Sequence, residues 1–264
     1  MRITRPKLPD LKPHWNDWGD MSLTLAAQAP GEAEIFASLQ GEGPSVGTPV
    51  AFLRLSRCNL ACVWCDTAYT WHFDGDNRPH RDGETFARKP NQLSLAVEDV
   101  AAQIAALGQT RLIITGGEPL MQAGKLADML EHLPDMAVEV ETNGTIDPPA
   151  RLDVRVDQYN VSPKLAHSGN PADLALKPAM LARWATDERA FFKFVIAGAE
   201  DVDEVLALAR THAIPARRIF LMPEGTDSAA LRQRMDWLAP LCLKHGFRMS
   251  DRLHIHLYGD TRGS

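Results

Sequence analysis

The sequence has few cysteines, no long apolar run and no excess of basic residues. Four cysteines in 264 residues are too few for a disulfide scaffold of the kind that holds small secreted proteins together. No apolar run reaches the roughly 20 residues of a membrane-spanning helix, and nothing at the N-terminus is typical of a secretory signal. Acidic residues outnumber basic ones, and the formal net charge is -6, which disfavours nucleic-acid binding. We therefore expect a cytoplasmic protein that acts on a small molecule and binds neither membrane nor nucleic acid.

The composition is that of a globular protein. Hydrophobic residues make up 45% and charged residues 23% of the chain, which suffices for a sizeable core and argues against disorder. Residues 1–30 stand apart, because Pro6, Pro9, Pro13 and Pro30 interrupt any regular element. We expect an N-terminal extension over residues 1–30 and a single domain over residues 31–264.

Three of the cysteines lie close together in the sequence. Cys58, Cys62 and Cys65 have the spacing C-x3-C-x2-C, and thiolates grouped in one loop bind soft metals or iron–sulfur clusters. A structural zinc site requires four ligands, whereas Cys242 lies far downstream and His72 fits no zinc-finger spacing. Three thiolates would leave one iron of a four-iron cluster open to another ligand. A zinc-binding structural module remains the alternative, and iron and sulfide content would distinguish the two.

The rest of the chain alternates between strand and helix patterns. Strands are predicted over residues 34–39, 49–56, 111–115, 137–141, 158–161, 191–196 and 218–222, and helices over 94–107, 125–133, 202–212 and 231–245. Residues 72–91 are predicted to form a loop, and 253–259 an extended segment with His254 and His256 on one face. Six consecutive strand–helix units predict an α/β protein with an abbreviated parallel (β/α)6 barrel that is open on one side. Its functional site is expected at the carboxyl ends of the strands.

Arg54 is the anomaly in an otherwise apolar predicted strand. A guanidinium between Leu53 and Leu55 needs a partner, and its planar fork suits a carboxylate. From the residues alone, that carboxylate is expected to be an internal Asp or Glu.

Several motifs together resemble a known family. The cysteine spacing is similar to that of radical S-adenosylmethionine (SAM) enzymes. The stretches LQGEG (39–43), CDTAYTW (65–71), TGGEP (115–119), SPK (162–164) and LHIHLYG (253–259) resemble, in the same order, those of the 7-carboxy-7-deazaguanine synthases. The resemblance covers roughly residues 30–263.

The resemblance implies a cofactor set and a reaction. Cys58, Cys62 and Cys65 would hold a [4Fe-4S] cluster, and SAM would bind its fourth iron and be cleaved to a 5′-deoxyadenosyl radical. That radical would take a hydrogen atom from 6-carboxy-5,6,7,8-tetrahydropterin, whose ring contracts as ammonia leaves, in 7-deazapurine (queuosine) biosynthesis. A flavodoxin-type electron donor, Mg²⁺ and a homodimer are also implied.

The resemblance further implies roles for individual residues. The residues expected to bind SAM are Trp64, Cys65, Asp66, Gly117, Glu118, Ser162, Pro163, Lys164, Met222, Pro223, Glu224 and Gly225. Those expected to bind substrate are Leu39, Gln40, Gly41, Glu42, Arg54 and Thr115, and Thr67 is the expected Mg²⁺ ligand. Met222 departs from the Gln that the family often has at this position, so only a backbone contact would survive there.

A second radical SAM function shares part of this pattern. Enzymes that install a glycyl radical on a partner protein carry the same cysteine spacing and GGEP stretch. The LQGEG segment, Arg54 and the CDTAYTW segment argue against that alternative.

Overall fold

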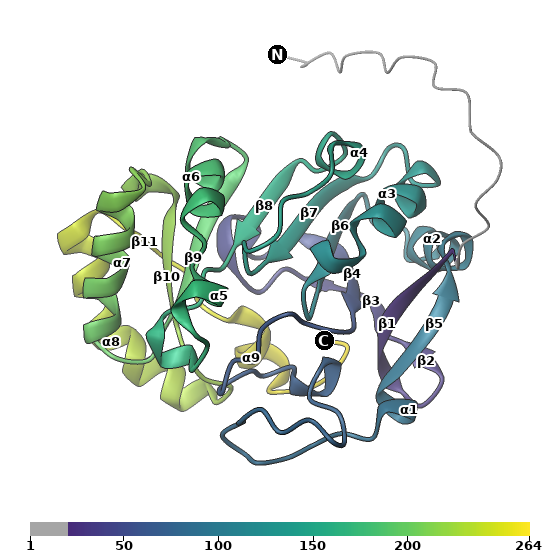
Figure 1. Cartoon of the computed structure of the whole chain (residues 1–264), viewed down its shortest axis with the longest axis horizontal. Helices are drawn as coiled ribbons and strands as arrows, with labels where there is room; N and C mark the ends of the chain where they lie inside the picture. The colour runs from purple at the N-terminus through teal and green to yellow at the C-terminus, as the bar shows by residue number, and fades with distance from the viewer. Residues whose placement is uncertain (1–20) are drawn as a thin grey trace.

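A curved parallel sheet forms the centre of the molecule (Figure 1). The computed structural model describes residues 21–264. Six long parallel strands are neighbours in chain order: β4 (Pro49–Leu55), β6 (Arg111–Gly116), β7 (Ala137–Thr142), β8 (Gln158–Val161), β9 (Ala190–Ile196) and β10 (Ile219–Pro223). The short strand β11 (Arg248–Met249) extends one edge beyond β10. The predicted six-unit (β/α)6 barrel, open on one side, is confirmed.

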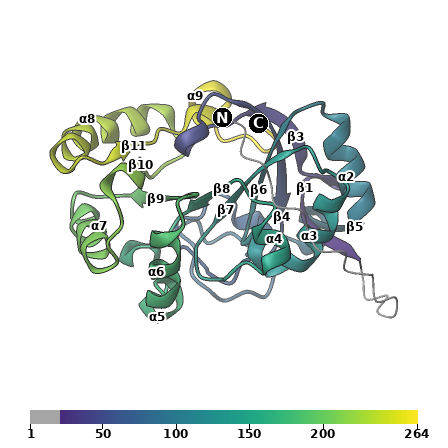
Figure 2. The ribbon, with the colours of Figure 1, turned by 90° about the horizontal axis from the view of Figure 1, so that it is seen from above.

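Helices cover the outer face of this sheet (Figure 2). They are α2 (Val97–Ala106), α3 (Ala123–Glu131), α4 (Ala150–Asp153), α5 (Ala172–Ala175), α6 (Pro178–Thr186), α7 (Glu200–Thr211) and α8 (Ser228–His245). The single turn α1 (Arg88–Asn91) and helix α9 (Leu253–Tyr258) do not belong to this layer, and Figure 1 shows α9 in the middle of the molecule, near the C-terminus. The core lies between the two layers, where the fully buried Trp184, Phe192 and Leu112 belong to one continuous cluster. Burial on both sides of the parallel strands explains their near-continuous apolar sequences. None of the helices within residues 21–264 is long and apolar enough to cross a membrane.

The predicted domain boundary at residue 30 is wrong. Strand β1 (Ser22–Ala29) is antiparallel to β5 (Gln92–Ala96), from Ser22↔Ala96 to Ala26↔Gln92, and pairs with β4 at Leu25↔Leu55. Its Leu23 and Leu25 are fully buried, as the alternation of apolar and polar residues at 22–25 would indicate. Strand β2 (Glu32–Ala33) pairs with β1, and strand β3 (Ile35–Leu39) pairs with β4. The earlier residues, Trp15 and Trp18 among them, lie outside the described part of the chain.

Two other local predictions are wrong. The helix predicted from residue 94 begins only at Val97, and Ser94 lies in β5, because β1 supplies a strand partner that the local sequence does not reveal. Residues 253–258 form helix α9 rather than an extended segment, so His254 and His256, two residues apart, do not share a face. The 72–91 segment is a loop as predicted, apart from the single turn α1 and a bridge between Phe73 and Phe86.

We predict that Leu25→Ala destabilises the whole domain, because β1 belongs to its core. Deleting a fully buried leucine side chain should lower the free energy of unfolding by about 2–5 kcal/mol, measured by urea denaturation. The matched control is Leu243→Ala, since Leu243 is 85% exposed and should change stability by less than about 0.5 kcal/mol. Equal stabilities of the two variants would contradict the assignment of β1 to the core.

Candidate active site

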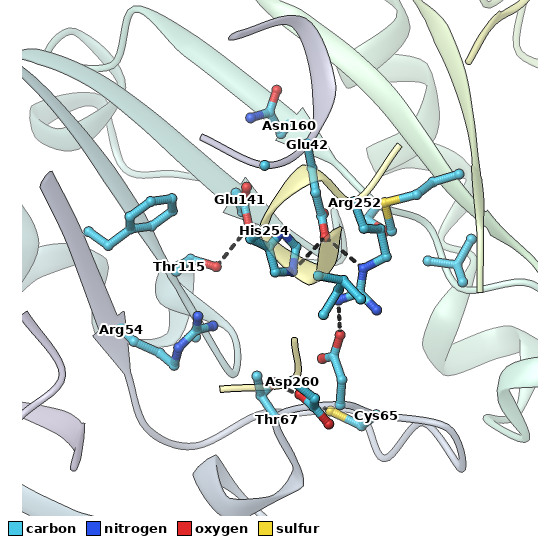
Figure 3. Close-up of a pocket in the computed structure, with 18 of the residues that line it drawn as sticks. Glu42, Arg54, Cys65, Thr67, Thr115, Glu141, Asn160, Arg252, His254 and Asp260 are labelled. Carbon is cyan, nitrogen blue, oxygen red and sulfur yellow. Dashed lines mark hydrogen bonds and ion pairs between the residues drawn. The ribbon is translucent and has the colours of Figure 1, made fainter. Parts of the chain in front are cut away.

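A cavity lies at the carboxyl ends of the parallel strands, where the sequence predicted the site (Figure 3). It brings together all six predicted substrate residues: Leu39, Gln40, Gly41, Glu42, Arg54 and Thr115. It is also lined by Trp64, Cys65, Asp66, Thr67, Gly117, Ser162, Lys164 and Met222 from the other predicted groups. Segments more than 200 residues apart in the chain therefore meet at one cavity.

Arg54 pairs with an internal carboxylate, as its place in an apolar strand requires. Its Nε donates to Oε1 of Glu34 at 2.7 Å, and the Tyr69 hydroxyl donates to Oε2 of Glu34 at 2.8 Å. Burial alone would lower the pKa of the guanidinium, but the Glu34 carboxylate outweighs it and raises that pKa. Within residues 21–264 the two Nη groups have no hydrogen-bond partner, and the side chain lines the cavity. Arg54 is thus fixed through its Nε, and its two Nη groups remain available to a ligand.

Glu42 lies in a buried network of charges (Figure 3). Its carboxylate pairs with the Lys193 ammonium and accepts from Nε of Arg252 at 3.1 Å. Burial would raise the pKa of Glu42, but Lys193 and then Arg252 outweigh this effect and hold the pKa below its ordinary value. Glu42 is therefore a carboxylate at neutral pH, with its oxygens already engaged by cations.

Arg252 connects three separate segments and was not among the site residues predicted from the sequence. Besides Glu42, its guanidinium binds the Asp66 carboxylate and donates to the backbone carbonyl of Gly225 at 2.6 Å. It is only 7% exposed. The sequence signal for Arg252 was its position, because this cation directly precedes the LHIHLYG stretch. His254, which follows it, also lines the cavity, and burial lowers its pKa despite the nearby Glu42.

Two glycines allow close approach between segments of the site. A Cβ on Gly117 would lie 1.9 Å from the carbonyl oxygen of Arg57, and one on Gly41 would lie 2.1 Å from Nδ1 of His254. Only glycine permits the β6 loop to touch the cysteine loop, and the LQGEG loop to touch α9.

The TGGEP stretch does not present its carboxylate to the cavity. Glu118 is fully buried, and it accepts from the backbone N–H groups of Leu120 at 3.0 Å and Asn143 at 2.7 Å and from the Thr142 hydroxyl at 2.8 Å. The prediction that the Glu118 side chain contacts SAM is therefore corrected. Glu118 instead has an internal role and connects the loop after β7 to the loop after β6.

Four other predicted SAM residues are not among those lining the cavity, namely Pro163, Pro223, Glu224 and Gly225. Glu224 instead pairs with Arg81 and Arg234, and Gly225 receives Arg252. The carboxyl ends of strands predict which loops lie near the site. They do not predict which side chains of those loops point into the cavity.

Glu141 and residues 260–264 were not assigned individual ligand-binding roles from the sequence. The Glu141 carboxylate accepts from the Gln40 side-chain amide at 3.2 Å and from the Thr115 hydroxyl at 2.8 Å. Asp260, Thr261, Arg262 and Ser264 also line the cavity. Arg262 holds this segment, with its guanidinium carbon 3.6 Å from the Tyr69 ring centroid and a hydrogen bond of 2.8 Å to Asn91. Figure 1 accordingly shows the C-terminal end in the middle of the molecule.

The cysteine loop fits an iron–sulfur cluster. All three thiols are free, and burial raises the pKa of Cys58 to about 12 and that of Cys62 to about 11, so a bound cation is needed to hold them as thiolates. Side chains from outside the motif donate to the sulfurs of Cys62 and Cys65, as expected around cluster ligands. Within residues 21–264, no group of three or more His, Cys, Asp or Glu side chains is arranged to hold a single metal ion.

Comparison with known proteins agrees with this site. The model of the Radical SAM superfamily matches residues 53–232. The 7-carboxy-7-deazaguanine synthase of Pyrobaculum aerophilum is 37% identical over 235 residues, which cover 87% of this chain and 95% of the relative. That of Rhodopirellula baltica is 31% identical over 264 residues, covering 90% and 94%. The crystal structure of QueE from Escherichia coli, 26% identical, aligns with a TM-score of 0.60 over 89% of this chain and 96% of its own.

The barrel, the three-cysteine loop and the superfamily match define a radical SAM enzyme, whose cofactors are a [4Fe-4S] cluster and SAM. Within that superfamily, the chain belongs to the family of the 7-carboxy-7-deazaguanine synthases. The resemblance seen in the sequence motifs is thereby confirmed.

We predict that Glu42→Gln destabilises the protein at neutral pH by about 3–5 kcal/mol, since it leaves buried cations without their counter-charge. Because the pKa of Glu42 is lowered from its ordinary value of 4.5, its contribution to stability is complete above that value and is lost as the pH falls below it. The stability difference from wild type should therefore narrow below about pH 4.5, measured by urea denaturation across pH.

The matched control for this pH dependence is Glu131→Gln. Glu131 pairs with Arg151, and its side chain is 70% exposed, so its removal should change stability by less than about 0.5 kcal/mol. A Glu42→Gln difference that stayed constant between pH 7 and pH 3 would contradict the assigned charge state.

Proposed function

We propose that the enzyme converts 6-carboxy-5,6,7,8-tetrahydropterin to 7-carboxy-7-deazaguanine with loss of ammonia. The observation that carries the proposal is the joining, at one cavity, of the LQGEG segment, the free fork of Arg54 and the cysteine loop. The substrate needs one site for a carboxylate and another for a flat, polar ring, and the two sides of the cavity offer these. The activity named for the relatives supports the same reaction.

The carboxylate of the substrate would bind at Arg54. Bidentate pairing with a guanidinium fixes both the position and the orientation of a carboxylate. Glu34 and Tyr69 keep the guanidinium in place before the ligand arrives, so little ordering is needed on binding.

The pterin ring would lie against the LQGEG segment and β7. Gln40, Thr115 and Glu141 are hydrogen-bonded to one another at the cavity, and they offer donors and acceptors for the amide and amino edge of a pterin. Glu42, kept ionised by Lys193 and Arg252, gives this side of the cavity a fixed acceptor.

The cofactors would bind on the cysteine side of the cavity. Cys58, Cys62 and Cys65 would hold the cluster, and Trp64, Asp66, Gly117, Ser162, Lys164 and the backbone at Met222 would surround SAM. When bound, cluster and SAM supply a carbon radical that abstracts hydrogen from an unactivated carbon. The protein's own contribution is to hold the substrate carbon in register and to exclude water, with the C-terminal segment covering the cavity.

Thr67 would be a ligand of Mg²⁺, which would also bind the substrate carboxylate. Magnesium takes one or two protein oxygens and completes its octahedron with water and substrate. Thr67 lines the cavity, which supports this role. A flavodoxin-type electron donor, a homodimeric assembly and a cytoplasmic location remain predictions.

The activity is tested by anaerobic turnover. Reconstituted enzyme with reductant, SAM, Mg²⁺ and 6-carboxytetrahydropterin should release 7-carboxy-7-deazaguanine and ammonia, detected by mass spectrometry. Cys62→Ala should lose both 5′-deoxyadenosine and product, whereas Cys242→Ala, outside the motif, should keep both. Formation of 5′-deoxyadenosine by wild type without any deazapurine would reject this substrate and reopen the glycyl-radical alternative.

Arg54→Lys tests the carboxylate site separately. Lysine keeps the charge but loses the fork, so we expect KM for the pterin to rise about tenfold or more. Uncoupled cleavage of SAM without substrate should stay at the wild-type rate, because Arg54 is assigned no contact with SAM. An unchanged KM would remove Arg54 from the substrate site.

Thr67→Val tests the magnesium site, because valine keeps the shape and loses the hydroxyl. We expect the Mg²⁺ concentration for half-maximal turnover to rise about tenfold or more, as for other ligand losses. Thr85→Val, in the 72–91 loop, is the control and should leave it unchanged. Iron content must match wild type, since the Thr67 hydroxyl lies 3.6 Å from the Cys65 sulfur. An unaltered Mg²⁺ dependence would count against this ligand.

A further inference from the structure

Two side chains outside the cysteine motif donate hydrogen bonds to cysteine sulfurs. The indole Nε1–H of Trp71 donates to Sγ of Cys65 at 3.3 Å, and the amide Nδ2–H of Asn170 donates to Sγ of Cys62 at 3.4 Å. Trp71 follows the motif along the chain, whereas Asn170 comes from the loop after β8, more than 100 residues away. The sulfur of Cys58 receives no such side-chain bond from the described residues.

Both donors are fixed in position. Trp71 is 5% exposed, with the Arg78 guanidinium carbon 4.7 Å from its ring centroid and the His72 ring 4.9 Å away. The Asn170 amide is set by its own oxygen, which accepts from the backbone N–H of Ala61 at 2.8 Å. The same amide nitrogen also donates to Oγ of Ser168 at 3.2 Å, and its second hydrogen is the one that the Cys62 sulfur accepts.

We propose that Trp71 and Asn170 raise the reduction potential of the cluster through these N–H···S hydrogen bonds and so make its reduction easier. Reduction adds one electron and no proton, and the added negative charge spreads onto the thiolate sulfurs. A neutral N–H donor stabilises the more negative state more strongly, and hydrogen bonds to sulfur are a recognised determinant of cluster potential. Both residues are positioning residues, because they act on the cluster through Cys65 and Cys62.

The environment of the sulfurs makes this contribution large. Cys62 and Trp71 are buried, and hydrogen bonds to charge strengthen where water is excluded.

The test is an anaerobic potentiometric titration of the cluster-loaded protein without SAM or pterin, followed by electron paramagnetic resonance of the reduced cluster. Trp71→Phe keeps the buried ring and removes only the N–H. At a fixed potential we expect its ratio of reduced to oxidised cluster to fall about tenfold, which is about 59 mV for one electron. Trp237→Phe, on α8 and packed against the core, is the control and should match wild type.

Asn170→Ala provides the second measurement and should shift the potential in the same direction. Matching iron and sulfide contents are required for each comparison. If the cluster-loaded Trp71→Phe protein had the wild-type reduction potential, the proposal for Trp71 would be overturned. The same result in Asn170→Ala would overturn the proposal for Asn170. Loss of the cluster from both variants would make the contacts structural supports and would also overturn it. Because no pterin is present, the result is independent of the proposed substrate.

Discussion

The arrangement of the active site depends on one buried guanidinium. Arg252 holds the LQGEG loop through Glu42, the cysteine loop through Asp66 and the loop after β10 through the carbonyl of Gly225. Removing these charged groups from water costs free energy. That cost is offset only because each charge is paired with another. The three loops therefore have one favourable mutual arrangement, although the barrel attaches each of them at a different strand.

This coupling separates two kinds of cation in the cavity. Lys193 and Arg252 are committed to internal carboxylates, whereas Arg54 uses only Nε for Glu34 and keeps both Nη groups for a ligand. Under the proposed function, a substrate carboxylate would bind there without breaking an existing ion pair. The ion pairs made by Lys193 and Arg252 are structural, and they define the shape of the rest of the cavity.

The sequence predicted the barrel and the location of the site because both follow from local patterns. Short apolar runs, each ending in Gly, Pro, Asn or Asp, are visible residue by residue, and parallel strands bring their carboxyl ends together. What it did not predict depends on contacts distant in the chain. Strand β5 exists because β1 pairs with it. Glu118 faces the protein interior because it finds three donors there: the Leu120 N–H in its own loop, and the Thr142 hydroxyl and Asn143 N–H at the end of β7. Arg252 showed no periodicity, and only the fold gives it Asp66 and Glu42 as partners.

The contact between Gly41 and His254 has a consequence for how this sequence can evolve. A side chain at position 41 would occupy the space of the imidazole, since its Cβ would come within 2.1 Å of Nδ1. Any larger residue at 41 is therefore tolerated only after position 254 has become smaller or α9 has moved. The order of the two substitutions is then restricted, and among divergent descendants of this chain the two positions should vary together, although 213 residues separate them.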